Sequence, residues 1–207
     1  MKLLLVAATR AEVNLVADTL SSKNYTIDLL ITGVGMVATA FSLGKHFTAN
    51  NYDLALNAGI AGSFNRNIKT GEVVQVQQDC FSELGAEDGA DFIPINQLGF
   101  GECLVKPFPH AMQIPALASL RTVTGITVNK VHGSEETIKE TVNRLHPDIE
   151  SMEGAAFFYA CNQANIPSVQ IRSISNFVER RNRDNWDIGL AVRNLDTFLR
   201  DLINEIK

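Results

Sequence analysis

The chain has 207 residues, of which 45% are hydrophobic and 20% charged, and its formal net charge is −5. These values are typical of one soluble globular domain, here expected to span residues 1–207, with a core that needs no disulfide or structural metal. The negative charge argues against binding to nucleic acid or to a membrane surface, because both favour a basic face.

The composition also bears on location and metal binding. The apolar residues 1–8 are too short for a membrane span, and Arg10 and Glu12 interrupt them before a signal peptide could form. The three cysteines are odd in number and form no CxxC pair, which indicates reduced thiols. The four histidines are dispersed. We therefore expect a cytoplasmic protein without a bound metal.

Short apolar runs alternate with stretches of helical periodicity along the chain. Strands are expected at Lys2–Ala8, Thr26–Gly33, Tyr52–Gly62, Gly71–Asp79, Gly125–Asn129 and Ser168–Ser175. Helices are expected at Val13–Leu20, Val37–Phe47, Ser134–His146, Met152–Ile166 and Leu190–Ile206. This alternation predicts an α/β sandwich with a largely parallel sheet.

Residues 81–117 are rich in Gly, Pro and Phe and show no clear period. We expect a long loop with short elements here, and it is the segment in which to look for a lid or a subunit contact. Ligands of α/β folds usually bind beyond the carboxyl ends of the strands, so polar residues at those ends are candidates for a site.

Thr9 and Glu12 follow the first expected strand with the spacing of a capping box. Such a box would account for both residues, and from the residues alone this interpretation is favoured. The alternative is that the Glu12 carboxylate accepts a proton from a water or hydroxyl at the end of the strand.

Glycines follow the next two strands. Gly33, Gly35 and Ala38 formally match the dinucleotide fingerprint G-x-G-x-x-A. We reject that match because Asp53 precedes the following apolar run instead of ending it. The glycines of "NAGIAG" permit either a plain turn or a close approach to a sugar or an anion.

Glu150 and Glu153 stand where a helix is expected to begin. Acidic residues in a first turn favour the helix dipole by about 0.3 to 1 kcal/mol, which is one explanation of both. Since Glu153 runs directly into the apolar "GAAFFYAC", we expect its carboxylate to have a definite polar partner.

Five short motifs occur in a characteristic order: the first strand leading to Glu12, "TGVGMVATA", "NAGIAG", "ESMEGAA" and "IRSISN". In this order they resemble the purine nucleoside phosphorylase and hydrolase superfamily, and within it the methylthioadenosine nucleosidase branch. The resemblance covers nearly the whole chain. It implies a three-layer α/β/α sandwich with a largely parallel central mixed sheet, and cleavage of N-glycosidic bonds without a metal or organic cofactor. It also implies a small-molecule nucleoside substrate and a homodimer or higher homo-oligomer.

The same resemblance implies roles for individual residues. Glu12 would activate the attacking water, Glu153 would bind the ribose 2′ and 3′ hydroxyls, and Met152 would pack against the sugar. Ile60 stands where many relatives have a hydroxyl residue, and Val131 lies near the place of an aromatic one. Because a branched alkyl side chain cannot bind phosphate oxygens and the Glu12 carboxylate would repel a phosphate dianion, hydrolysis is favoured over phosphorolysis.

Asn176 departs from the adenine-specific nucleosidases, which carry at this position an aspartic acid that protonates purine N7. Hypoxanthine presents acceptors at N7 and O6, and the NH2 of Asn can donate to both or to either. An ionised Asp would repel O6, and an unmade buried hydrogen bond costs about 1 to 3 kcal/mol. Asn176 therefore predicts a 6-oxopurine leaving group.

The segment "SISNFVERRNRDNWDIGLAVRNL", together with "ESMEGAAFFY", resembles the futalosine hydrolase family, which releases hypoxanthine from futalosine in menaquinone biosynthesis. The substrate of that family carries a benzoate-bearing group at the ribose 5′ end, so a basic residue and an apolar slot are expected. Candidates for the carboxylate are Arg180, Arg181, Arg183 and Lys106, and candidates for the ring are Phe92, Phe100 and Phe177. Each arginine taken singly is more readily explained by a solvated loop.

Two alternatives stay open. One is a nucleosidase of the methylthioadenosine/S-adenosylhomocysteine or inosine type, or a purine nucleoside phosphorylase. The other is a purine-binding or dinucleotide-binding module without hydrolytic activity.

Overall fold

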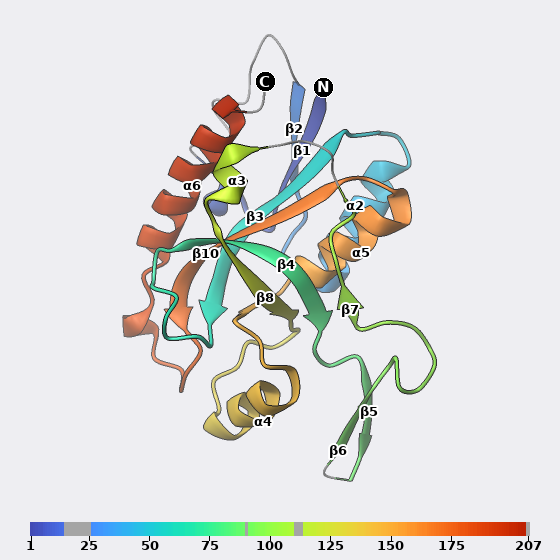
Figure 1. The fold of residues 1–207 in the computed structure, drawn as a ribbon, viewed down its shortest axis with the longest axis vertical. Helices are drawn as coiled ribbons and strands as arrows, with labels where there is room; N and C mark the ends of the chain where they lie inside the picture. The colour runs from blue at the N-terminus through green and yellow to red at the C-terminus, as the bar shows by residue number, and fades with distance from the viewer. Residues whose placement is uncertain (15–25, 90, 110–113, 206–207) are drawn as a thin grey trace.

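A mixed sheet forms the centre of the molecule (Figure 1). The computed structural model describes residues 1–14, 26–89, 91–109 and 114–205. The sheet contains β1 (Lys2–Ala7), β2 (Thr26–Ile31), β3 (Leu54–Ser63), β4 (Val73–Phe81), β7 (Leu104–Val105), β8 (Arg121–Thr127), β9 (Ile149–Ser151) and β10 (Ser168–Phe177). Its strands follow the order β10-β4-β8-β9-β3-β1-β2, with β7 beside β4. Most neighbours are parallel, while β4 pairs antiparallel with β10 and with β7, and β9 pairs antiparallel with β3.

Helices cover both faces of the sheet, so the predicted three-layer α/β/α sandwich is confirmed. The helices are α2 (Met36–Phe47), α3 (Pro115–Ala118), α4 (Glu135–Leu145), α5 (Gly154–Ala164) and α6 (Ile188–Glu205), with short 3-10 turns η1 (Arg10–Glu12) and η2 (Arg183–Asn185). In Figure 1, α2 and α5 pack together on one side of the sheet and α6 lies with α3 on the other. The helix α4 lies apart, beyond the carboxyl ends of the strands.

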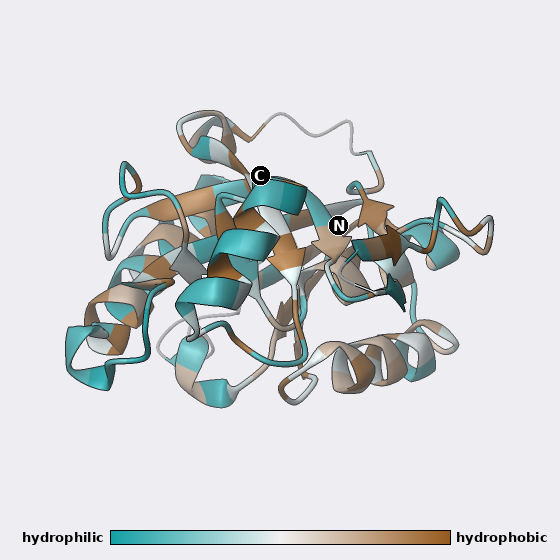
Figure 2. Ribbon diagram, turned by 90° about the horizontal axis from the view of Figure 1, so that it is seen from below, coloured by the Kyte–Doolittle hydropathy of each residue, from teal (hydrophilic) through white to brown (hydrophobic). Residues whose placement is uncertain are grey.

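The strand β1 shows why the sheet is buried on both faces. Successive side chains of a strand point to opposite faces, so an all-apolar run needs a cover on each side. Leu4 and Val6 belong to the core beneath α2 and α5, whereas Leu3 and Leu5 join the core under α6. The strands are accordingly largely hydrophobic in Figure 2, while α6 alternates between hydrophilic and hydrophobic residues.

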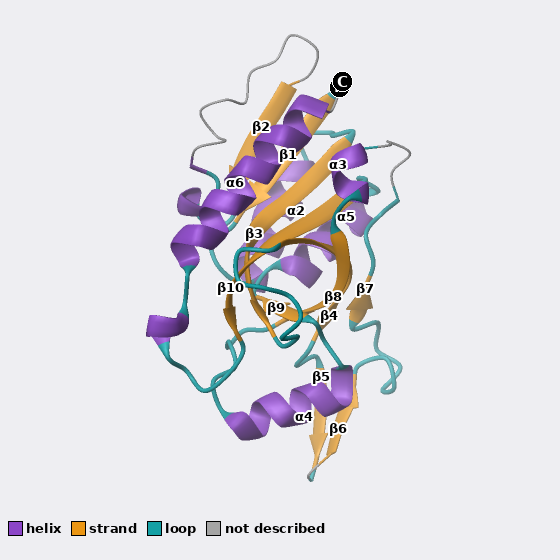
Figure 3. Ribbon diagram, turned by 60° about the vertical axis from the view of Figure 1, so that its left-hand side comes forward, coloured by secondary structure: helices purple, strands orange, loops and turns teal. Residues whose placement is uncertain are grey.

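Part of the sheet closes on itself, which the strand pattern did not predict. The strand β10 pairs with β4 on one edge and with β3 on the other, so β10, β4, β8, β9 and β3 form a ring (Figure 3). The pairing of β10 with β3 slips between Ile174 and Asn176. This irregularity lies at the carboxyl end of both strands, next to the pocket described below, where bulges often re-aim a side chain.

Two expectations need comment. Glu150 does not enter a helix: it is the central residue of β9, and only Glu153 stands at the start of α5, as its N-cap. The helix expected at Val13–Leu20 lies mostly outside the described residues, since Leu15, Val16 and Leu20 are not among them; Val13, which is described, is the C-cap of η1.

The described residues of the segment 81–117 form only short elements, as expected. They include the hairpin of β5 (Gly85–Asp88) and β6 (Asp91–Pro94), which projects from the body of the molecule (Figure 1). The role of the segment as a lid or subunit contact stays a prediction.

Candidate active site

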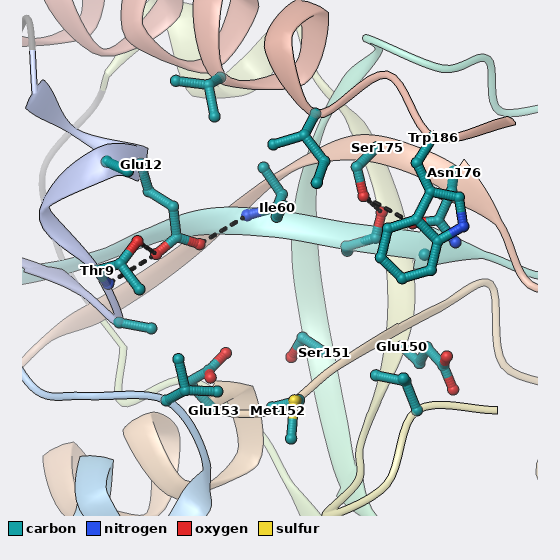
Figure 4. A pocket seen from close by; sticks show the side chains of 18 of the residues that line it. Thr9, Glu12, Ile60, Glu150, Ser151, Met152, Glu153, Ser175, Asn176 and Trp186 are labelled. Atoms are coloured by element: carbon teal, nitrogen blue, oxygen red, sulfur yellow. Dashed lines mark hydrogen bonds between the residues drawn. The ribbon is translucent and has the colours of Figure 1, made fainter. Parts of the chain in front are cut away.

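A pocket lies at the carboxyl ends of β1, β3 and β10 and gathers six of the seven predicted site residues. They are Glu12, Ile60, Val131, Met152, Glu153 and Asn176. Figure 4 shows Glu12 at one end, Asn176 and Glu150 at the other, and Met152 and Glu153 along the wall between them. The site is therefore built from motifs that lie far apart in the sequence.

Glu12 is both the cap and a pocket residue, so the two interpretations of its carboxylate coexist. Oε2 accepts hydrogen bonds from the Thr9 backbone N–H at 2.9 Å and from the Thr9 hydroxyl at 3.0 Å. Oε1 accepts from the Ile60 backbone N–H at 3.2 Å and keeps a further lone pair available. The cap fixes the side chain in one orientation and leaves Oε1 able to accept a proton from a water.

A buried arginine, Arg172 of β10, lies beside this carboxylate. The glycine at position 59 makes room for both groups: a Cβ there would come 2.7 Å from Arg172 Nη1 and 2.9 Å from Glu12 Oε1. Arg172 is only 1% exposed and donates from Nη2 to Asn57 Oδ1 at 2.5 Å. Its charge compensates the carboxylates that the pocket collects. Arg172 was not predicted as a site residue. Its position inside an apolar strand could have indicated one, because burying an unpaired charge is very costly.

Glu153 has the definite partner that its position predicted. Its Oε1 accepts from the Gly35 backbone N–H at 2.9 Å. Gly35 has φ +99°, a conformation open to glycine, which aims that N–H at the carboxylate. Burial raises the pKa of Glu153, and the charge of Arg172 and the Gly35 N–H oppose that shift. The "TGVG" turn thus orients an acid in the pocket rather than a dinucleotide.

The amide of Asn176 is held in one orientation by its neighbours. Its Oδ1 accepts from the Ser175 hydroxyl at 2.7 Å, and its Nδ2 donates to the Phe177 carbonyl at 2.9 Å. A carbonyl can only accept, so the group that faces Phe177 must be the NH2. One of the two N–H donors is therefore used, and one remains for a ligand. Of the two expected patterns, donation to either N7 or O6 is the one that this geometry favours.

Phe177 does not line the pocket. Its ring lies under the guanidinium of Arg66, 4.4 Å from the ring centroid to Cζ, and the side chain points away because neighbouring residues of a strand alternate in direction. Trp186, which the residue pattern did not single out, lies at the Asn176 end of the pocket instead (Figure 4). It follows η2 in an irregular segment, where periodicity carries no signal.

The candidates for a 5′ carboxylate and ring are scattered. Arg181 lies over the Trp186 ring, with Cζ 5.2 Å from its centroid, and so reaches the pocket wall. Arg180 lines a separate groove with Glu135 and Asn182. Phe92 stacks with Arg144, and Phe100 is 80% exposed over another hollow. Arg183 and Lys106 are exposed and outside the pocket lining.

A second buried polar cluster lies beneath Glu153. Asp79 accepts from the Thr127 hydroxyl at 2.8 Å and from Gln170 Nε2 at 3.1 Å. The residue after Glu153 must be small, because a Cβ on Gly154 would come 2.1 Å from Asp79 Oδ2. This explains the glycine of "MEGAA" by packing. Burial raises the pKa of Asp79 from 3.8 to about 6, despite these hydrogen bonds and the charge of Arg172.

The raised pKa predicts a pH-dependent cost to stability. Between about pH 4 and 6 the unfolded chain has released the Asp79 proton while the folded chain still holds it, so the free energy of unfolding falls as pH rises through this window. Asp79→Asn removes that dependence. As the pH rises from about 4 to 6, the free energy of unfolding of the variant should therefore increase by up to about 3 kcal/mol relative to that of the wild type. Urea unfolding at pH 4 and 7 measures the difference. If the free energies of unfolding of the two proteins changed with pH in the same way, the raised pKa of Asp79 would be contradicted.

Among the described residues, no group of three or more His, Cys, Asp and Glu side chains is arranged to hold a metal ion. No helix within the described ranges is both long and apolar enough to cross a membrane.

Known proteins are similar to this chain in sequence and in fold. Residues 9–204 match the phosphorylase superfamily. A futalosine hydrolase of Streptomyces coelicolor is 33% identical over 178 residues, covering 80% of this chain and 73% of that protein. The structure of a Helicobacter pylori futalosine hydrolase superposes with a TM-score of 0.84 at 17% identity, covering 100% of this chain and 98% of that one. A methylthioadenosine/S-adenosylhomocysteine nucleosidase of Colwellia psychrerythraea, solved with adenine, superposes with a TM-score of 0.83 at 20% identity, covering 100% and 96%.

The two solved structures share the fold of this chain, and the family match over residues 9–204 includes Glu12, Glu153 and Asn176. The chain belongs to the phosphorylase superfamily and, within it, to the futalosine hydrolase family.

Proposed function

We propose that the protein hydrolyses the N-glycosidic bond of futalosine and releases hypoxanthine, a step of menaquinone biosynthesis. The observation that carries the proposal is the pairing of a water-activating carboxylate, Glu12, with an amide donor, Asn176, at opposite ends of one pocket. The 33% identical relative bears the same activity in its name. The three cysteines are free thiols, which fits a reducing cytoplasm.

The chemistry follows from the positions of the groups. The bond between ribose C1′ and purine N9 breaks, with an oxocarbenium-like transition state at the sugar. Glu12 takes a proton from the water whose oxygen bonds to C1′. In this proposal Glu153, which lies between the two ends, holds the ribose hydroxyls, and Met152 packs beside the sugar. The N–H of Asn176 stabilises the negative charge on the departing base, which then gains its proton from solvent.

Hydrolysis fits the nucleophile end of the pocket better than phosphorolysis. Glu12 presents a carboxylate there, and Ile60 presents an alkyl side chain while its N–H is already donated to Glu12. A phosphate dianion would meet repulsion and few donors. Water needs only one acceptor.

Arg181 and Trp186 are proposed to bind the benzoate at the 5′ end, the guanidinium taking the carboxylate and the indole the ring. Losing a charge-assisted hydrogen bond costs about 1.5 to 3 kcal/mol. Arg181→Ala should therefore raise KM for futalosine by about 10- to 100-fold and leave KM for inosine unchanged. Arg180→Ala, in the neighbouring groove, is the matched control. Equal effects on both substrates would rule out this role.

The chain is also proposed to form a homodimer or higher homo-oligomer through an apolar surface on α2 and the segment after β6. Val37, Phe41 and Phe100 are 77%, 72% and 80% exposed there. Apolar residues gathered in this way mark protein contacts. Sedimentation at the mass of a single chain would contradict the proposal.

A direct assay tests the function. The protein is incubated with futalosine, inosine and methylthioadenosine, with and without phosphate, and the released base is identified by chromatography. We expect fast, phosphate-independent release of hypoxanthine from futalosine. Fast adenine release from methylthioadenosine would favour the alternative nucleosidase, phosphate dependence would favour a phosphorylase, and purine binding without any turnover would indicate a binding module.

A further inference from the structure

A second carboxylate, Glu150, lies at the Asn176 end of the pocket and has no part in the steps above. It is the central residue of β9 and lines the pocket, although only 4% of it is exposed. Gly62 separates it from Asn176: a Cβ on this glycine would lie 3.3 Å from Asn176 Nδ2 and 3.5 Å from Glu150 Cγ. These two atoms are therefore less than about 7 Å apart, and Figure 4 shows both side chains at the same end.

His132 holds this carboxylate in place. Its backbone N–H donates to Glu150 Oε1 at 3.1 Å, and its ring Nδ1 lies 2.5 Å from Oε2. A carboxylate only accepts, so Nδ1 carries a hydrogen toward Oε2, and Nε2 lies 2.9 Å from the Thr141 hydroxyl oxygen. Both oxygens are anchored, yet each retains a lone pair. The Glu150 carboxylate is therefore held rigidly, and it presents only hydrogen-bond acceptors to the pocket.

The same contact removes a backbone donor from the pocket wall. The His132 N–H could otherwise donate to a ligand, but it donates to Glu150 Oε1. The wall therefore presents an acceptor beside the single donor that Asn176 has left.

We propose that Glu150, positioned by His132, is a specificity-determining residue that accepts the N1–H of a 6-oxopurine and excludes 6-aminopurines. This inference rests on the proposed function, because it assigns the base selectivity of the same site. A 6-oxopurine presents O6 as an acceptor next to N1–H as a donor, which matches the N–H of Asn176 beside the carboxylate of Glu150. Adenine presents the reverse, a donor at its 6-amino group and an acceptor at N1, so its N1 lone pair would face an anion.

The test compares bases that differ at the relevant positions. Calorimetry measures binding of hypoxanthine, adenine and the 1-deaza analogue of hypoxanthine, in which C–H replaces N1–H, to the wild type, Glu150→Gln and the exposed control Glu140→Gln. We expect the wild type and the control to prefer hypoxanthine over both other bases by about 10- to 100-fold. Glu150→Gln should lose most of this preference, and its affinity for the 1-deaza analogue should equal that of the wild type.

Two results would overturn the assignment. One is equal weakening of all three bases in Glu150→Gln, which would mean that Glu150 only supports the fold. The other is equal affinity of the wild type for hypoxanthine and its 1-deaza analogue, a result that needs no variant to fold. Failure of the proposed function is a separate observation, because a protein that leaves futalosine intact could still bind hypoxanthine in a Glu150-dependent way.

Discussion

Replacing Glu12 by Gln should lower kcat for futalosine by about 10²- to 10⁴-fold, the range expected when a general base is lost. The amide keeps the size of the side chain, but it cannot take a proton from water. One of its two terminal atoms also becomes a donor, so either the Thr9 bonds or the Ile60 bond is lost. Single-turnover release of hypoxanthine measures the effect, and KM should change little because Glu12 lies at the nucleophile end.

A control must separate loss of catalysis from loss of the cap. Removing one capping hydrogen bond costs about 1 kcal/mol, so Glu12→Gln should remain folded, as thermal unfolding would report. Glu136→Gln makes the same chemical change on the exposed side of α4 and should leave kcat unaltered. A folded Glu12→Gln protein with wild-type turnover would show that the carboxylate serves only as a cap, the interpretation that its sequence spacing favoured.

The fold was largely accessible from the sequence because its elements are locally encoded. Alternating apolar runs and helical periods predict β1, β2, β3, β4 and β10 close to their observed ends. The ring closed by β10 and β3 was not accessible, because strand order depends on pairing between distant segments. The short strand β9 was misread as a helix start, since three residues carry no periodicity and acids also suit a first turn.

The site divides in a similar way. Glu12, Glu153 and Asn176 stand at the ends of predicted elements, where chemistry is expected, and resemblance supplied their roles. Trp186 sits in an irregular segment, and the pairing of His132 with Glu150 joins a loop to a strand 18 residues away. Phe177 was a candidate for the ring of the 5′ group, but alternation in β10 turns it outward under Arg66. Near a register shift, the direction of a side chain at the end of a strand depends on how the strand pairs with its neighbours. The local sequence alone therefore does not predict it.

Exchanging Asn176 for Asp should lower kcat/KM for futalosine by about 10- to 100-fold, the cost of one unmade buried hydrogen bond together with charge repulsion. The Phe177 carbonyl now receives an N–H from Asn176. An ionised Asp would set a carboxylate oxygen against that carbonyl and against purine O6. A protonated Asp has a single hydrogen, so it could satisfy the carbonyl or the base but not both, whereas the amide has one hydrogen for each.

The base dependence of the Asn176→Asp variant distinguishes recognition from simple damage. Hydrolysis of the 6-amino analogue of futalosine should fall much less than hydrolysis of futalosine, since a protonated carboxyl can donate to N7 and accept from the amino group. Because Glu150 would still face N1 with an acceptor, Asn176→Asp alone should not produce an efficient adenine nucleosidase. Combining it with Glu150→Gln should improve the 6-amino analogue further, which steady-state rates on both substrates would measure. If Asn176→Asp were as active on futalosine as the wild type, or more active, the purine would be recognised by groups other than the Asn176 amide.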